Sequence, residues 1–178
     1  MPRSPFTFHR LALVILFVLP LFEARAVAPS PTDQVNAVVD ALTRGCAARD
    51  PIAVMSHFVK TPGDALVVFD IAPPLEDIGY ESNLAKLRAF FGGLDGPIVL
   101  EWRDRKVTVD HNHAFVIAHL YFAATSKSGA KIEQQARSTL VLQRIGGDWL
   151  IVHEHDSVPA EFKIPGYGDA ASGAGAAR

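Results

Sequence analysis

The feature that most constrains the fold is the stretch of residues 131–159, which has the pattern of two strands joined by a tight turn. Its two halves, RSTLVLQR and WLIVHEHDS, are rich in β-branched and aromatic residues, and Gly146 and Gly147 lie between them. Strand-forming runs separated by Gly-Gly predict a hairpin, because glycine readily adopts the positive φ angles that a two-residue turn requires. The sequence therefore predicts an antiparallel pair in which Arg144 stands opposite Trp149.

The first 26 residues have the pattern of a signal peptide. Arg3 and Arg10 give a positive start, residues 11–22 form an apolar run, and the run is followed by the small-x-small sequence Ala-Arg-Ala at residues 24–26. The apolar run is too short for an ordinary membrane-spanning helix. We expect cleavage after residue 26 and a periplasmic or secreted product that is free of the membrane, with an uncleaved anchor as the alternative.

The charge of the remaining chain argues against a nucleic-acid partner. The full chain has a formal net charge of −2, and the signal segment carries three arginines and one glutamate, so its removal leaves a more acidic domain. A mildly acidic domain without a basic stripe does not attract a phosphate backbone. The single cysteine, Cys46, has no partner for an internal disulfide.

Helix signals fill the first half of the domain. Ser30 is expected to cap the first helix with Asp33 as the acid of a capping box. Two further helices are predicted at residues 52–58 and 80–91, and a brief strand is predicted at residues 65–70. The first helix has one apolar stripe at helical spacing, so these helices are expected to cover a sheet.

The second half of the chain changes to an apolar period of two. Residues 98–109 and 114–125 are predicted to be long strands joined by a turn, and Gly129 suits the left-handed position of the next loop. The Gly/Ala-rich tail, residues 165–178, is expected to be disordered. The order of elements predicts an α+β fold, in which three N-terminal helices pack on a curved, mainly antiparallel sheet of four long strands and one short strand.

This order, together with DWLIVHEHDSVP on the last strand, resembles the nuclear-transport-factor-2-like superfamily. Within it the chain is most similar to the SnoaL-like branch, and it also resembles the association domain of calcium/calmodulin-dependent kinase II. The resemblance covers residues 32–162 and implies a SnoaL-like domain at residues 27–164, shaped as a cone with a pocket between sheet and helices. It also implies homodimers packed through the sheet. Such folds serve isomerases, polyketide cyclases, dehydratases, ligand binders and scaffolds, so the fold alone does not assign a function.

Counting residues outward from the predicted turns gathers polar side chains on one face of the sheet. A two-residue turn at residues 111–112 would place Trp102 opposite Tyr121 and Asp104 opposite His119. The side chains predicted to share the concave face are Trp102, Asp104, His119, Tyr121, Gln135, Arg137, Thr139, Glu154 and Asp156. A register slip of one residue would move such a set to the other face.

Four of these residues form a candidate catalytic set for acid/base chemistry. His119 titrates near neutral pH and could act as general acid or base, with Asp104 as its orienting partner. Tyr121 could stabilise an enolate oxygen, and Arg137 could clamp a substrate. The structural alternatives are a histidine held in a hydrogen-bond network of the sheet and a cross-strand ion pair between Arg137 and Asp156.

The candidate ligand-binding residues are Trp102, Gln135, Glu154, Asp156, Tyr80 and Asp70. Glu154 and Asp156 are two residues apart on one strand, so they could share a proton and raise one pKa, or they could be ordinary charges at a solvated rim. Asp70 and Tyr80 fall where the resemblance places the mouth of the cone. Tyr80 could instead pack as a helix staple.

Two His-x-His pairs, at residues 111–113 and 153–155, could chelate a metal, but neither has a carboxylate or cysteine at ligand spacing. We therefore expect no metal and no cofactor. The predicted function is binding of a small, largely apolar molecule. If the protein is an enzyme, isomerisation, cyclisation or dehydration fits, and the alternatives are non-catalytic ligand binding and an oligomeric scaffold.

Overall fold

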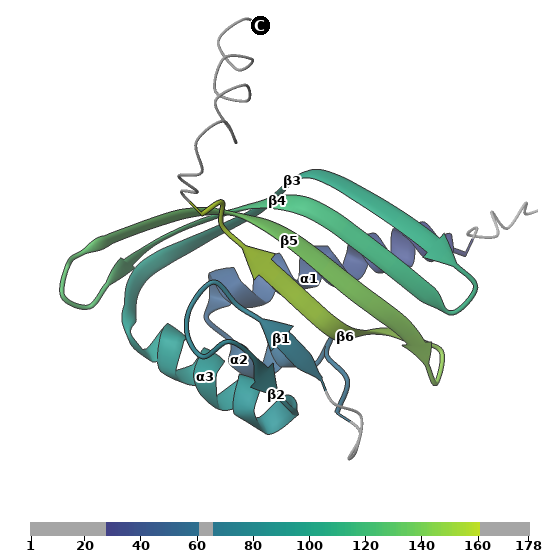
Figure 1. The fold of residues 1–178 in the computed structure, drawn as a ribbon, viewed down its shortest axis with the longest axis horizontal. Coiled ribbons are helices and arrows are strands. Elements are labelled where there is room, and N and C mark those ends of the chain that lie inside the picture. Colours follow the sequence, from purple (N-terminus) through teal and green to yellow (C-terminus); the bar gives the residue numbers. More distant parts are fainter. Residues whose placement is uncertain (1–27, 61–65, 161–178) are drawn as a thin grey trace, which may run out of the picture.

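The computed structural model describes residues 28–60 and 66–160, in which three helices pack against one face of a curved six-stranded sheet (Figure 1). The strand order is β2-β1-β6-β5-β4-β3, and all neighbours are antiparallel except β1 and β6. The elements are α1 (Pro31–Ala48), α2 (Pro51–Met55), β1 (Val67–Phe69), β2 (Asp77–Ile78), α3 (Tyr80–Gly92), β3 (Leu94–Asp110), β4 (His113–Ser126), β5 (Lys131–Ile145) and β6 (Asp148–Ser157).

The predicted α+β fold is confirmed, with one more short strand than expected. The two-residue strand β2 lies in a segment that is too irregular in sequence to predict a strand. The second helix ends at Met55, three residues before the predicted end, and β1 is shorter than residues 65–70. The predicted signal peptide and tail lie outside the described residues. No helix in the described part of the chain is long and apolar enough to span a membrane.

The first two helices form where their capping residues predict. The Ser30 side chain accepts a hydrogen bond from the Asp33 backbone N–H at 3.1 Å, and the Asp33 carboxylate accepts one from the Ser30 N–H. The Asp50 carboxylate caps α2 by accepting hydrogen bonds from the backbone N–H groups of Ile52 and Ala53. Gly45 lets the two helices approach closely, because a Cβ at this position would lie 2.7 Å from Cγ2 of Val54.

The turns of the sheet also form as predicted. Gly146 and Gly147 take φ angles of 62° and 101°, Arg144 pairs with Trp149, and Gly129 has a φ of 86°. Strands β4 and β5 pair in the predicted register, which places His119 opposite Arg137 and Tyr121 opposite Gln135.

Two β-bulges overturn the register predicted for the outer pairs of strands. In β3 the pairing shifts between Arg103 and Lys106, where Asp104 has a φ of 52°. Trp102 therefore pairs with Leu120 instead of Tyr121, and Arg103 replaces Asp104 opposite His119.

In β6 the register shifts after the pair Leu142 and Ile151, so that Val141 pairs with His153. Asp156 consequently stands opposite Ser138, and Arg137 stands opposite Ser157. Each extra residue moves the side chains beyond it to the other face of the sheet. The prediction that nine polar side chains share one face is therefore wrong.

The helices cover the inner face of the sheet, on which β4 and β5 place Ala114, Val116, Ala118, Leu120, Phe122, Ala136, Ser138, Leu140 and Leu142. The opposite, outer face carries Phe115, Ile117, His119, Tyr121, Gln135, Arg137 and Thr139. The core forms where the inner face meets the apolar stripe of α1, which consists of Val35, Val38, Val39 and Leu42.

Candidate functional site

A cavity of about 380 Å³ lies between the inner face of the sheet and the helices, where the predicted pocket should be. Its wall is mostly apolar and aromatic, as in sites that bind small organic molecules. The apolar lining includes Leu42, Val54, Met55, Phe58, Leu87, Phe90, Phe91, Leu100, Trp102, Leu120, Phe122 and Ile132. Against this wall the polar side chains of the cavity stand out, and they come mainly from β6, β5 and α3.

Glu154 and Asp156 are neighbouring inward-facing residues of β6, and both line the cavity. Burial raises the pKa of Glu154 well above its usual value, and the charges of Asp156 and Asp70 add to the rise. Burial also raises the pKa of Asp156 to about 6, and the charge of Asp70 adds to this rise. Two carboxyl groups in one apolar cavity resist ionising together, so the pair retains a proton near neutral pH.

Two polar atoms of the cavity wall lack a partner within the described structure. Oδ1 of Asp156 and Nε1 of Trp102 are both buried, and neither makes a hydrogen bond. Oγ of Ser138, on the strand opposite Asp156, is also buried and makes no hydrogen bond. Buried polar atoms are normally satisfied, so an unpaired acceptor and an unpaired donor in one cavity suit a ligand that supplies the complementary groups.

Lys86 of α3 lies at the side of the cavity formed by β1 and β2. Its ammonium group lies 3.0 Å from Oδ2 of Asp70 and 2.6 Å from Oδ2 of Asp77. Burial lowers the pKa of Lys86, but hydrogen bonds to Asp77 and Asp70 more than offset this and raise it. Lys86 is therefore a charged group that is already paired with two carboxylates.

The predicted ligand-binding residues divide between the cavity and the rest of the molecule. Trp102, Glu154, Asp156 and Asp70 line the cavity, whereas Tyr80 does not. The Tyr80 ring packs against the core and lies 4.6 Å from the Lys60 ammonium group, so its structural alternative is the better description.

Gln135 points outward, and its neighbour Gln134 occupies the cavity wall instead. Cys46 was also missed as a lining residue. Burial, and then the charge of Glu154, raises the pKa of this thiol to about 12. The alternation along β4 carries a signal for the correct face, because its even-numbered residues from 114 to 124 are all apolar whereas its odd-numbered ones include His119 and Tyr121.

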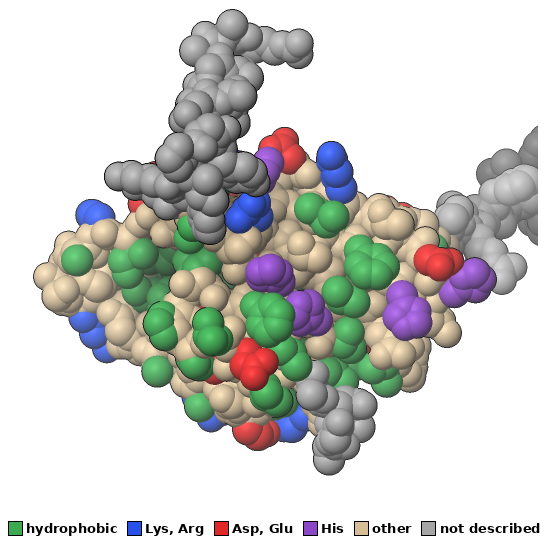
Figure 2. Space-filling view, viewed as in Figure 1, with side chains coloured by type: hydrophobic (Ala, Val, Ile, Leu, Met, Phe, Trp, Pro, Cys, Tyr) green, Lys and Arg blue, Asp and Glu red, His purple; other side chains and the backbone are tan. Residues whose placement is uncertain are grey.

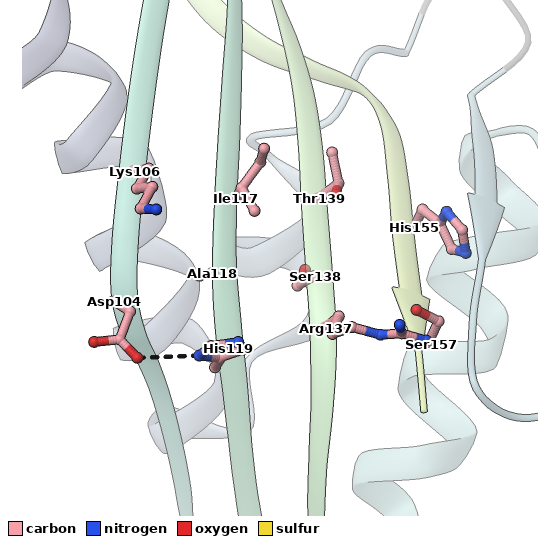
Figure 3. Close-up of a pocket in the computed structure, with 10 residues that line it drawn as sticks. All are labelled: Asp104, Lys106, Ile117, Ala118, His119, Arg137, Ser138, Thr139, His155 and Ser157. Atoms are coloured by element: carbon pink, nitrogen blue, oxygen red, sulfur yellow. Dashed lines mark hydrogen bonds and ion pairs between the residues drawn. The ribbon is translucent and has the colours of Figure 1, made fainter. Parts of the chain in front are cut away.

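The predicted catalytic set does not reach the cavity. Nδ1 of His119 lies 3.0 Å from Oδ2 of Asp104, as predicted, but the two side chains are 68% and 76% exposed. They border a groove of about 530 Å³ on the outer face together with Arg137 (Figure 3). The helices lie behind the sheet in this view, so placing these residues in the interior pocket was wrong. The bulge in β6 separates His119 and Arg137 from Asp156, and the bulge in β3 separates them from Trp102.

Tyr121 also belongs to the outer face. Its hydroxyl donates a hydrogen bond to the Glu133 carboxylate at 3.1 Å, and this bond raises the pKa of Tyr121. The guanidinium carbon of Arg103 lies 4.2 Å from the ring centre. Tyr121 is therefore held in a surface network and is not positioned to stabilise an oxygen in the cavity.

Histidine and hydrophobic side chains lie together on the exposed side of β1 and β6 (Figure 2). The rings of His153 and His155 pack edge-on against Phe69, with centres 5.1 and 5.5 Å from it. Nδ1 of His153 lies 2.7 Å from the Val67 carbonyl oxygen, which accepts its hydrogen bond. Among residues 28–60 and 66–160 no group of three or more His, Cys, Asp or Glu is arranged to hold a metal ion.

Comparison with known proteins decides the family. Residues 35–161 match the family model of the SnoaL-like domain, which is well over half of the chain. The chain belongs to the SnoaL-like domain family. No curated protein matches this SnoaL-like chain.

Solved structures of the nuclear-transport-factor-2-like superfamily share the fold of this SnoaL-like domain. A superfamily member from Salmonella enterica is 19% identical, covers 77% of this chain and 96% of its own, and has a TM-score of 0.64. A protein from Xanthomonas campestris, named after the association domain of calcium/calmodulin-dependent protein kinase II, is 25% identical, with coverages of 76% and 95% and a TM-score of 0.60. A ketosteroid isomerase-like protein from Erwinia carotovora is 17% identical, with coverages of 72% and 97% and a TM-score of 0.58.

Proposed function

We propose that this SnoaL-like domain binds a small, largely apolar molecule in the interior cavity and moves a proton on it with Glu154 and Asp156. The observation that carries the proposal is an apolar cavity containing a carboxyl pair, in which Asp156 Oδ1 and Trp102 Nε1 have no hydrogen-bond partner among the described residues. A pair of carboxyl groups with raised pKa values is a common arrangement for acid/base chemistry near neutral pH.

The roles within the pair follow from their ionisation. Asp156, with a pKa of about 6, is ionised at neutral pH and can accept a proton from carbon or oxygen. Glu154 keeps its proton to a higher pH and can donate it to a developing oxyanion. Nε1 of Trp102 is a second donor on the same wall. This arrangement suits isomerisation, dehydration or cyclisation of a carbonyl compound by proton transfer.

Exchange of α-protons tests the proposal without knowledge of the natural substrate. A cyclic ketone such as 2-tetralone is incubated with the protein in D₂O, and deuterium uptake at carbon is followed by NMR. Asp156→Asn is expected to lower the exchange rate by about 10²–10⁴ fold while the ketone still raises the melting temperature. The matched control is Asp104→Asn, which makes the same change on the outer face and should leave exchange unchanged.

The same experiment separates the alternatives. Stabilisation by the ketone without exchange would indicate a non-catalytic binder. The absence of both stabilisation and exchange would argue against an interior binding site. Equal loss of exchange in both variants would contradict the assignment of the proton transfer to the cavity.

Homodimerisation and export complete the proposal. The outer face exposes Phe115 and Ile117 at 45% and 56% of their surface, and apolar side chains exposed together on a sheet suit packing against a second copy. The segment of residues 1–26 supports export to the periplasm or the medium. Light scattering of the purified protein and fractionation of the host cell test these two statements.

A further inference from the structure

Carboxyl groups outnumber cations among the described side chains that line the cavity. Among the described residues, the ionisable side chains of its lining are Cys46 from α1, Asp70 at the end of β1, Lys86 from α3, and Glu154 and Asp156 from β6. Three of the five are carboxyl groups, and one is a cation. The described lining residues of α2 and of β3, β4 and β5 carry no ionisable side chain.

The single cation of this set does not balance the carboxyl groups. Lys86 contacts Asp70 and Asp77 at 3.0 and 2.6 Å, so two carboxylates share one ammonium group before any ligand enters. Asp77 is 7% exposed, and solvent therefore screens this contact only weakly. With Lys86 so occupied, the carboxyl pair on β6 decides the charge that a ligand meets.

A ligand carboxylate would meet unfavourable contacts on this wall. It would place a second negative charge beside ionised Asp156 in an apolar environment, where like charges repel most strongly. Protonated Glu154 and Nε1 of Trp102 can donate to a carboxylate, but they can donate equally to an uncharged oxygen, so they do not offset this repulsion. The unpaired atom Oδ1 of Asp156 is an acceptor and needs a donor, which a carboxylate cannot supply. An alcohol can donate to this atom, and a protonated amine can also neutralise its charge.

We propose that the cavity selects its ligand by charge: it accepts a small apolar molecule whose polar group is uncharged or a protonated amine, and it rejects the same molecule with a carboxylate. This inference rests on the proposed interior site and narrows the chemical class of its ligand. It does not depend on whether the bound molecule undergoes a reaction.

The test uses one apolar body with three polar groups. The full chain is titrated by calorimetry at pH 8 with 1-naphthylmethylamine, 1-naphthalenemethanol and 1-naphthoate, and the series is repeated with the cyclohexyl equivalents. The amine and the alcohol are expected to bind at least about tenfold more tightly than the carboxylate. Naphthoate binding as tightly as the alcohol would overturn the inference. Failure of all members of both series would instead overturn the interior site itself.

Variants connect the discrimination to the carboxyl groups. Asp156→Asn should reduce the ratio of the affinities for the alcohol and the carboxylate by about tenfold. Asp104→Asn removes the same charge from the outer face and should leave this ratio unchanged. Asp77→Asn should also favour naphthoate, because it releases one of the two partners of Lys86. An unchanged difference in affinity in both Asp156→Asn and Asp77→Asn would contradict the role of these charges.

The pH dependence provides a second readout. Below pH 6 Asp156 becomes protonated while naphthoate stays ionised, so the penalty on the carboxylate should shrink between pH 8 and pH 5. The other ionisable groups that line the cavity, Cys46, Asp70, Lys86 and Glu154, are part of the same environment. If the difference in affinity between the alcohol and naphthoate stays constant from pH 8 to pH 5 in the wild type, that result would count against the inference.

Discussion

The carboxyl pair predicts an unusual effect of pH on the free energy of unfolding. The size of this effect can be worked out from the pKa of Asp156. Its pKa is about 6 in the folded protein and close to the ordinary value of 3.8 in the unfolded chain. The folded state therefore binds the proton more tightly, and the contribution of this group to the free energy of unfolding is largest below pH 3.8. It falls as the pH rises from about 4 to 6, because the proton must be lost from a buried site.

The size of the effect follows from the gap between the two pKa values. A difference of about two pKa units at about 1.4 kcal/mol per unit corresponds to about 3 kcal/mol. Asp156→Asn removes the titration. As the pH rises from 4 to 7.5, the free energy of unfolding of the variant should therefore increase by about 2–3 kcal/mol relative to that of the wild type. For a domain of this size that is a relative shift in melting temperature of about 6–12 °C.

Urea denaturation at pH 4 and pH 7.5 measures this difference directly. The quantity of interest is the change with pH in the stability difference between variant and wild type, because any packing defect of the asparagine is present at both pH values. Asp104→Asn on the outer face is the control and should show no such change. A stability difference for Asp156→Asn that is the same at both pH values would refute the reasoning.

Three further predictions test other parts of the structure. Lys86→Met should lower the free energy of unfolding by about 1–3 kcal/mol, because it leaves the buried carboxylate of Asp77 without its cation, and urea denaturation measures the loss. If the proposed dimer forms through the outer face, Ile117→Lys should convert it to a monomer in light scattering without affecting ketone binding, and a dimer of unchanged stability would exclude this surface. Gly45→Ala should cost about 1–2 kcal/mol in the same urea assay, since its Cβ would clash with Val54, and a stabilised variant would show that α2 can move away.

Local features of the fold were predictable because they depend on short-range chemistry. The capping box at Ser30, the Gly146-Gly147 turn and the left-handed Gly129 each require a particular residue at a particular backbone position. The register of β4 and β5 followed from the length of one short loop. Likewise, Glu154 and Asp156 had to share a face because they are two residues apart on one strand.

The composition of the site was only partly predictable, because counting outward from a turn carries every irregularity to the residues beyond it. A bulge near Asp104 and another in β6 each displaced the count by one residue, and no glycine marks the first of them. The alternation of apolar residues along β4 would have been a better guide to the inner face, since burial acts on each strand directly and does not accumulate error.

By itself, the sequence determined the helices, the turns, which of the four long strands are neighbours, and the presence of two carboxyl groups on one side of the last strand. Glu154, Asp156 and Trp102 face the helices as predicted, but only the tertiary structure decided that Gln134 joins them and that His119 and Arg137 face outward. The reason is that a bulge is favoured by the bending of a whole sheet over its helices, and that bending depends on packing between residues far apart in the chain.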